Sequence, residues 1–218
     1  MSKKKKEKIV GFHITGTRWR VVDKAQYKKS FTHEVAVQYL WNEIYESVDR
    51  EMTHILSGKK TGFYSGLRFL FAELTYLSHL YWGKKACHSP NESRYVARFM
   101  RKFNILAPEY GVHYDVFRHG LMHTHHPKWI KKNNKIIPWS VSNASKMTDF
   151  GVAIPEFSYQ IKKAIKKFWV ELKVEGVTSK RTRLDNFFEG FSDATKILTR
   201  KDIAKYAKKD FSNVKIPS

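Results

Sequence analysis

The chain is short of cysteine and of acidic residues, and each shortage narrows what the protein can be. The single cysteine, Cys87, among 218 residues excludes an internal disulfide framework and a cysteine-based zinc finger. Asp and Glu number 20 against 41 Lys and Arg. Residues 1–8 hold five Lys and one Glu, a net +4 of the total +21, which leaves +17 for the remainder. The electric field of so large a positive charge either keeps the protein soluble or attracts polyanions, of which nucleic acids are the commonest.

The N-terminus carries charge but no apolar core of a signal peptide. The most apolar stretch, residues 62–83, has the length of a membrane span, but Arg68, Glu73 and His79 interrupt it. We therefore expect a buried core helix there, and a cytoplasmic protein that makes no use of a membrane.

Most of the chain follows a helical period, with apolar residues at steps of three and four. We expect helices over residues 32–56, 63–82, 92–105, 109–123, 155–176, 182–197 and 199–209, short strands within 8–24, a hairpin at 128–141 and a loop at 142–155. The predicted class is mostly α: a four-helix bundle with a small β-hairpin and additional C-terminal helices. The predicted segments are a basic, partly strand-like arm at 1–29, the bundle at 30–127, and a hairpin with a helical extension, packed on the bundle, at 128–218.

One segment, "YDVFRHGLMHTHHPKW" at 114–129, concentrates titratable side chains. Asp115, His119 and His123 stand four residues apart, so on a continuous helix they form a ladder that could bind a metal, closed by His125 or His126. A simpler interpretation is a solvated helix end, where imidazolium groups interact favourably with the helix dipole.

Phosphate chemistry is the interpretation that we favour for this segment. The planar guanidinium of Arg118 can grip a phosphodiester, and His123 can transfer a proton near neutral pH. These two residue types suffice to cleave RNA without a metal or other cofactor, through attack of the ribose 2′-hydroxyl. Residues five apart on a regular helix point about 140° apart. Arg118 and His123 therefore converge only if the helix loosens near Gly120 or if a second copy contributes.

The same segment resembles the signature of the HEPN superfamily, an Arg and a His separated by four to six residues at the end of the last helix of a four-helix bundle. Arg118 and His123 match it, and the helices from Thr32 to His123 fit the bundle. The resemblance implies a homodimer with facing motifs and a metal-independent endoribonuclease, often a toxin or antiviral defence effector. It also implies an antitoxin or nucleotidyltransferase as a partner. Some members are inactive and only bind nucleotides, RNA or proteins.

His119 departs from the family pattern, which often has Asn after the arginine, and it could assist as a second proton carrier or phosphate donor. Glu73 and Asp115 are the predicted supporting residues. Glu73 is costly to bury unpaired, so we expect it to meet a cation, Arg118 or Arg68, or a backbone group. The predicted RNA-binding residues follow the motif and mix charge with an aromatic ring: Lys128, Trp129, Lys131 and Lys132.

Overall fold

A computed structural model describes residues 8–12, 19–23, 28–57, 63–87, 92–107, 110–121, 127–142 and 150–194. The chain forms two compact units, one of Ser30–Ala194 and one of Met1–Lys29 with Thr195–Ser218. Within the smaller unit, β1 (Lys8–Phe12) and β2 (Trp19–Asp23) pair antiparallel, which confirms the short strands predicted within 8–24. The helix predicted at 199–209 lies outside the described residues.

The larger unit is mostly helical, which confirms that the fold is mostly α. Its elements are α2 (His33–Tyr39), η1 (Leu40–Tyr45), α3 (Glu46–Ser57), α4 (Phe63–Trp82), η2 (Gly83–Ala86), α5 (Glu92–Phe103), α6 (Tyr110–His113), η3 (Tyr114–His119), β3 (Ile130–Lys132), β4 (Lys135–Ile137), β5 (Ser140–Ser142), β6 (Gly151–Ala153), α8 (Ile154–Val177) and α9 (Thr182–Ala194). η1 and η3 are π-helical turns, and α2, η1 and α3 run on as one long helix. Within the described chain no helix combines the length and the apolarity needed to cross a membrane.

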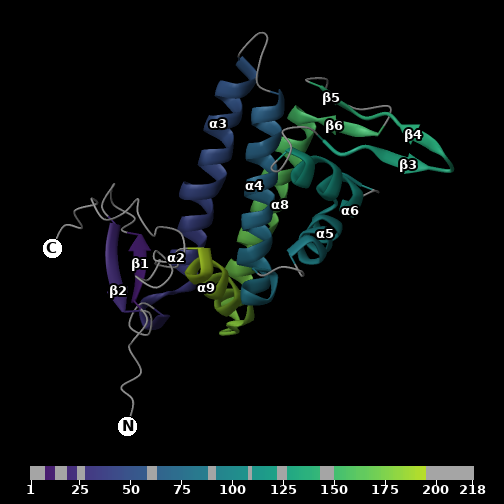
Figure 1. The fold of residues 1–218 in the computed structure, drawn as a ribbon. Helices are drawn as coiled ribbons and strands as arrows, with labels where there is room; N and C mark the ends of the chain where they lie inside the picture. The colour runs from purple at the N-terminus through teal and green to yellow at the C-terminus, as the bar shows by residue number, and fades with distance from the viewer. Residues whose placement is uncertain are drawn as a thin grey trace, which may run out of the picture. The chain divides into compact units, whose positions relative to one another are not determined.

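Three long helices, α3, α4 and α8, lie side by side, and α5 and α6 cover one flank (Figure 1). α8 starts with Pro155 in its first turn, where the missing N–H costs nothing. It buries an inward stripe at helical spacing: Phe157, Ile161, Ile165, Phe168 and Leu172. Each such side chain stabilises the fold by about 1.5–3 kcal/mol. The sequence predicted that this helix belongs to an extension packed on the bundle. In the structure, α8 instead packs against α2, η1, α3 and α4 in the core.

α9 crosses α4 at Gly190, where any Cβ would collide with the carbonyl of His79. The N-terminus of α9 is capped from a distance. Glu175 of α8 accepts the backbone N–H of Arg183 at 2.8 and 2.7 Å and that of Leu184 at 3.0 Å, and its Oε1 also lies 3.2 Å from His33 Nε2. This carboxylate therefore caps the N-terminus of α9 in place of an N-cap side chain, and it connects α8 with α9 and α2.

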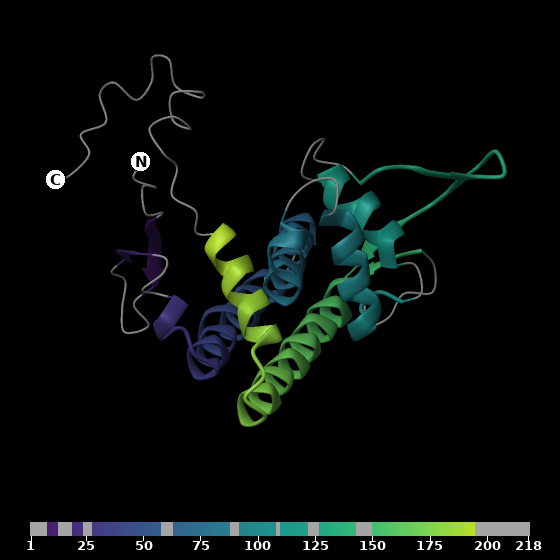
Figure 2. The same cartoon turned by 90° about the horizontal axis from the view of Figure 1, so that it is seen from below.

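The predicted hairpin at 128–141 is confirmed as the antiparallel pair β3–β4. Asn133 and Asn134 form its turn with φ of 49° and 61°, the left-handed conformation that Asn tolerates and that a two-residue hairpin turn requires. The hairpin projects from the bundle in both views (Figures 1 and 2). The loop predicted at 142–155 was wrong where a second small sheet of this unit forms. There β5 pairs in parallel with β6, which lies directly before α8.

Candidate functional site

Arg118 lies in the π-helical turn η3, in which hydrogen bonds span five residues and the helix is widened. Its guanidinium carbon stands 5.8 Å from the centre of the Tyr114 ring on the preceding turn. Its Nη2 atom lies 3.2 Å from Oε1 of Glu92, and its side chain is 21% exposed. The arginine of the predicted motif is thus held in a partly buried position by a carboxylate from another helix.

The two carboxylate oxygens of Glu92, the first residue of α5, contact three side chains. Oε1 accepts a hydrogen bond from the Tyr114 hydroxyl at 3.0 Å as well as pairing with Arg118. Oε2 lies 3.6 Å from Nε2 of His79 on α4. Thr75, one turn before His79, brings its Oγ1 to 3.0 Å from the Tyr114 hydroxyl. Two helices and the π-helical turn therefore meet at one carboxylate.

The surroundings of Glu92 and Tyr114 decide the charge of these two residues at neutral pH. The His79 ring, with the Arg118 guanidinium and the Tyr114 hydroxyl, lowers the pKa of Glu92 to about 2 against the opposing effect of burial. Burial raises the pKa of the Tyr114 phenol above its usual range. Glu92 is therefore an anion under all physiological conditions, and Tyr114 is a neutral donor.

A pocket of about 270 Å³ opens beside the cluster. It is lined by Ala72, Thr75, Tyr76, His79, Glu92 and Arg118. The first four of these lie on one face of α4, because they follow at helical spacing. A pocket walled by an arginine, a histidine and a hydroxyl suits an anionic ligand, and Glu92 places one negative charge among them.

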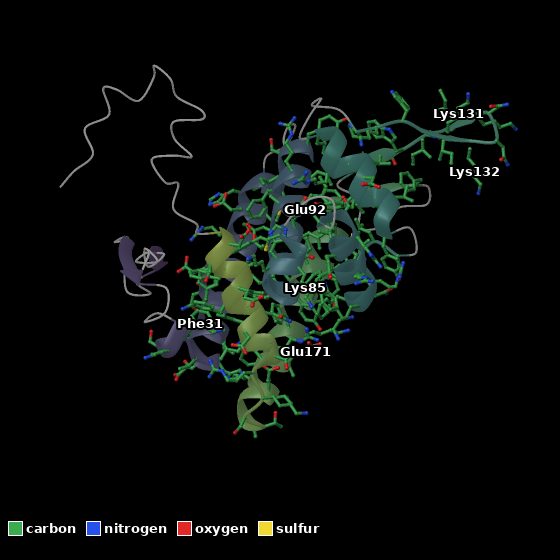
Figure 3. The ribbon with its side chains drawn as sticks, turned by 60° about the horizontal axis from the view of Figure 1, so that its bottom comes forward. Phe31, Lys85, Glu92, Lys131, Lys132 and Glu171 are labelled. Carbon is green, nitrogen blue, oxygen red and sulfur yellow. The ribbon has the colours of Figure 1, made fainter. Side chains whose placement is uncertain are left out.

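His79 and Glu92 are the residues of the pocket that sequence reasoning missed. His79 could have been noticed from the sequence, since it is a polar side chain one helical turn from Thr75 in a mostly apolar helix. The sequence around Glu92 gave no such indication, because the residues that Glu92 contacts lie on remote segments. Figure 3 labels Glu92 within the bundle, well away from Lys131 and Lys132 on the hairpin.

The other predicted catalytic residues are described only in part. His123 lies outside the described residues, as does the side chain of His119, so their roles stay predictions. Asp115 is exposed on η3. Glu73 makes no hydrogen bond or ion pair among the residues that the structure describes, and Arg118 pairs with Glu92 rather than with it. Burial raises the pKa of Glu73 to about 7.

The predicted RNA-binding residues all lie at the hairpin and are exposed. Trp129 is 72% exposed, and Lys128, Lys131 and Lys132 are also exposed. The base of the hairpin is fixed to the arginine-bearing turn, because the backbone N–H of Lys128 donates to the carbonyl of Val116 at 2.9 Å. Trp139 extends this attachment, with its ring 5.9 Å from Phe117 and 5.7 Å from Trp129.

Among the described side chains, no group of three or more His, Cys, Asp and Glu residues is arranged to hold a metal. The structure does not describe the side chains of His119 and His123, so the metal ladder of Asp115, His119 and His123 stays a prediction. No family model matches the sequence, and no match to it was found among curated proteins or solved structures.

Proposed function

We propose that the protein binds RNA and cleaves it as a metal-independent endoribonuclease, acting as a toxin or defence effector. The observation that carries this proposal is the position of Arg118. Its guanidinium lines a pocket together with His79, and the turn that bears it is hydrogen-bonded to the base of an exposed basic hairpin. A group that grips phosphate is thereby combined with a surface that attracts RNA.

The proposed reaction needs only groups that the chain supplies. The ribose 2′-oxygen attacks the adjacent phosphorus and loses its proton to a base, and the bond from phosphorus to the 5′-oxygen breaks as an acid protonates that oxygen. Arg118 holds the phosphate and neutralises the charge that grows on its oxygens. His123 acts as general acid or base, and His119 assists. The products are a 2′,3′-cyclic phosphate and a 5′-hydroxyl.

The hairpin is the proposed binding surface for the RNA around the cleaved bond. The exposed ring of Trp129 offers a stacking platform for an unpaired base, and Lys131 and Lys132 reach into solvent beside it. A homodimer would bring two copies of Arg118 and His123 together across a two-fold axis. Light scattering tests this assembly, and a monomer at micromolar concentration would argue against a shared site.

A second candidate function is RNA or partner binding without catalysis. It is favoured by the contact between Arg118 and Glu92, because an arginine that already faces a carboxylate is partly neutralised. This candidate retains the hairpin and the basic surface and drops the proton transfer.

Cleavage of a labelled RNA in EDTA separates these functions. The wild type is compared with Arg118→Ala, His123→Ala and the matched control Arg50→Ala, which removes an exposed arginine that also pairs with a glutamate. We expect cyclic phosphate ends with the wild type and the control, and their loss in the other two variants. Binding without cleavage, with or without added metal, would favour the second candidate. Activity that disappears in EDTA and returns with zinc or manganese would contradict the metal-free mechanism.

A further inference from the structure

We propose that Glu92 occupies the position of the RNA phosphate in the free protein, and that His79 joins Arg118 and Tyr114 in a phosphate site that opens when RNA displaces this carboxylate. The inference rests on the proposed function and adds to it a third phosphate-binding side chain and a mechanism of regulation.

The geometry of the carboxylate supports this assignment. Oε1 of Glu92 faces Arg118 and Tyr114, and Oε2 faces His79. Two oxygens on one centre, each directed at a separate donor, are also what a phosphodiester presents through its non-bridging oxygens. A phosphate that binds the Nη2 atom of Arg118 and the Nε2 atom of His79, the two atoms that now face Glu92, has to displace the Glu92 carboxylate.

Of the three groups around the Glu92 carboxylate, His79 lies at the longest distance from it. Its Nε2 atom is buried and makes no hydrogen bond among the described residues, and the nearest Glu92 oxygen is at 3.6 Å. A buried donor or acceptor left without a hydrogen bond is costly, so His79 gains from a ligand that reaches further into the pocket. The tetrahedral phosphate group, with more oxygens than a carboxylate, can make this contact.

The consequence is competition between Glu92 and RNA. Because Glu92 is an anion throughout the physiological pH range, RNA must displace a charged group that is tethered in the site. The free protein is then held in a state of low affinity. The opposite role, in which Glu92 merely orients Arg118 for catalysis, predicts that removal of its charge weakens binding and cleavage.

The test measures affinity for a fluorescent RNA with 2′-O-methyl riboses, which cannot be cleaved by 2′-hydroxyl attack. Glu92→Gln removes the charge with little change of shape. Glu171→Gln is the matched control, because Glu171 also accepts a tyrosine hydroxyl, at 2.8 Å from Tyr81, and also pairs with two cations, Lys102 and Arg183. It contacts the opposite end of α5, and Figure 3 shows the two glutamates apart.

We expect Glu92→Gln to bind this RNA on the order of ten times more tightly than the wild type, and Glu171→Gln to change affinity by less than about twofold. The gain should disappear when Arg118→Ala or His79→Ala is added, since the released site then lacks one of its members. Equal or weaker binding by folded Glu92→Gln overturns the inference, and so does an equal gain in the control. If Glu92→Gln does not fold, Glu92→Asp, which withdraws the carboxylate by one methylene, should show a smaller gain, and no gain there overturns the inference.

The two proposals fail in different ways. A wild type that cleaves ordinary RNA, combined with no gain for Glu92→Gln, rejects the displacement by RNA and leaves the ribonuclease standing. A clear gain on the 2′-O-methyl RNA, combined with no cleavage of ordinary RNA, rejects the ribonuclease and leaves the phosphate site standing.

Discussion

Arg118 and Glu92 face each other at 3.2 Å across the wall of the pocket, and their contact joins the π-helical turn η3 to the first residue of α5. Both side chains are only about a quarter exposed or less, at 21% and 23%. A partly buried ion pair of this kind is sensitive to loss of either partner, because the remaining charge is left without compensation.

Trp129→Ala should weaken RNA binding without affecting the fold. The ring is 72% exposed, so its removal costs the folded protein little packing, whereas loss of a stacked base costs about 1–3 kcal/mol of binding free energy. Fluorescence anisotropy with single-stranded RNA measures the effect. Trp129→Phe keeps a ring and should retain most of the affinity. Unchanged binding by Trp129→Ala would remove the tryptophan from the binding surface.

Gly190→Ala should destabilise the larger unit. Its Cβ would collide with the carbonyl of His79, so α9 has to move away from α4, at a cost of about 1–3 kcal/mol or more. Gly111→Ala is the control, since its Cβ would meet only the Cβ of Ala97 at an ordinary 3.7 Å. Urea denaturation should show a lower free energy of unfolding for Gly190→Ala alone, and equal stability of the two variants would contradict the close crossing.

Glu175→Gln should lower stability by about 1–2 kcal/mol at neutral pH, because charged hydrogen bonds to the backbone N–H groups at the start of α9 are weakened. Burial alone would raise the pKa of Glu175, but the bonds from Arg183, Leu184 and His33 outweigh it and hold the pKa below its ordinary value. The contribution is therefore present above the pKa of the unfolded chain and is lost as the pH falls through the folded pKa. Thermal melts at pH 7 and pH 3 should show the variant and the wild type converging in acid.

Glu73→Gln should stabilise the protein in alkaline solution. Burial raises the pKa of Glu73 from an ordinary 4.5 to about 7, so the wild type loses stability as the pH rises between these values. Replacing the carboxyl with an amide removes this loss, which amounts to about 3 kcal/mol above pH 7. Unfolding free energies at pH 5 and pH 8 measure it, with the exposed Glu43→Gln as the control. A variant whose advantage does not grow with pH would show that Glu73 is already compensated.

Local patterns in the sequence predicted the elements whose stability comes from their own residues. The helical spacing of Phe157, Ile161 and Ile165 predicted α8 within one residue of its start, because an amphipathic stripe has to be buried wherever the helix packs. Asn133 and Asn134 marked the hairpin, because the φ values of its turn are a local requirement. The parallel pairing of β5 with β6 was not predictable, since each strand has only three residues and no alternation to reveal it.

At the site, the sequence alone pointed to Arg118, because its planar guanidinium is suited to a phosphodiester and it stands within a cluster of histidines. It could not supply Glu92 or His79, which reach the pocket from α5 and α4 and acquire their meaning only when those helices pack around η3. The same is true of Glu175, whose partners at the start of α9 are set by the way α8 and α9 meet. Residue types and their spacing thus decided which helices form and which side chain we propose as the phosphate-binding group. The packing of remote helices decided which carboxylate that side chain faces, because an ion pair depends on distance in space and leaves no periodic trace along the chain.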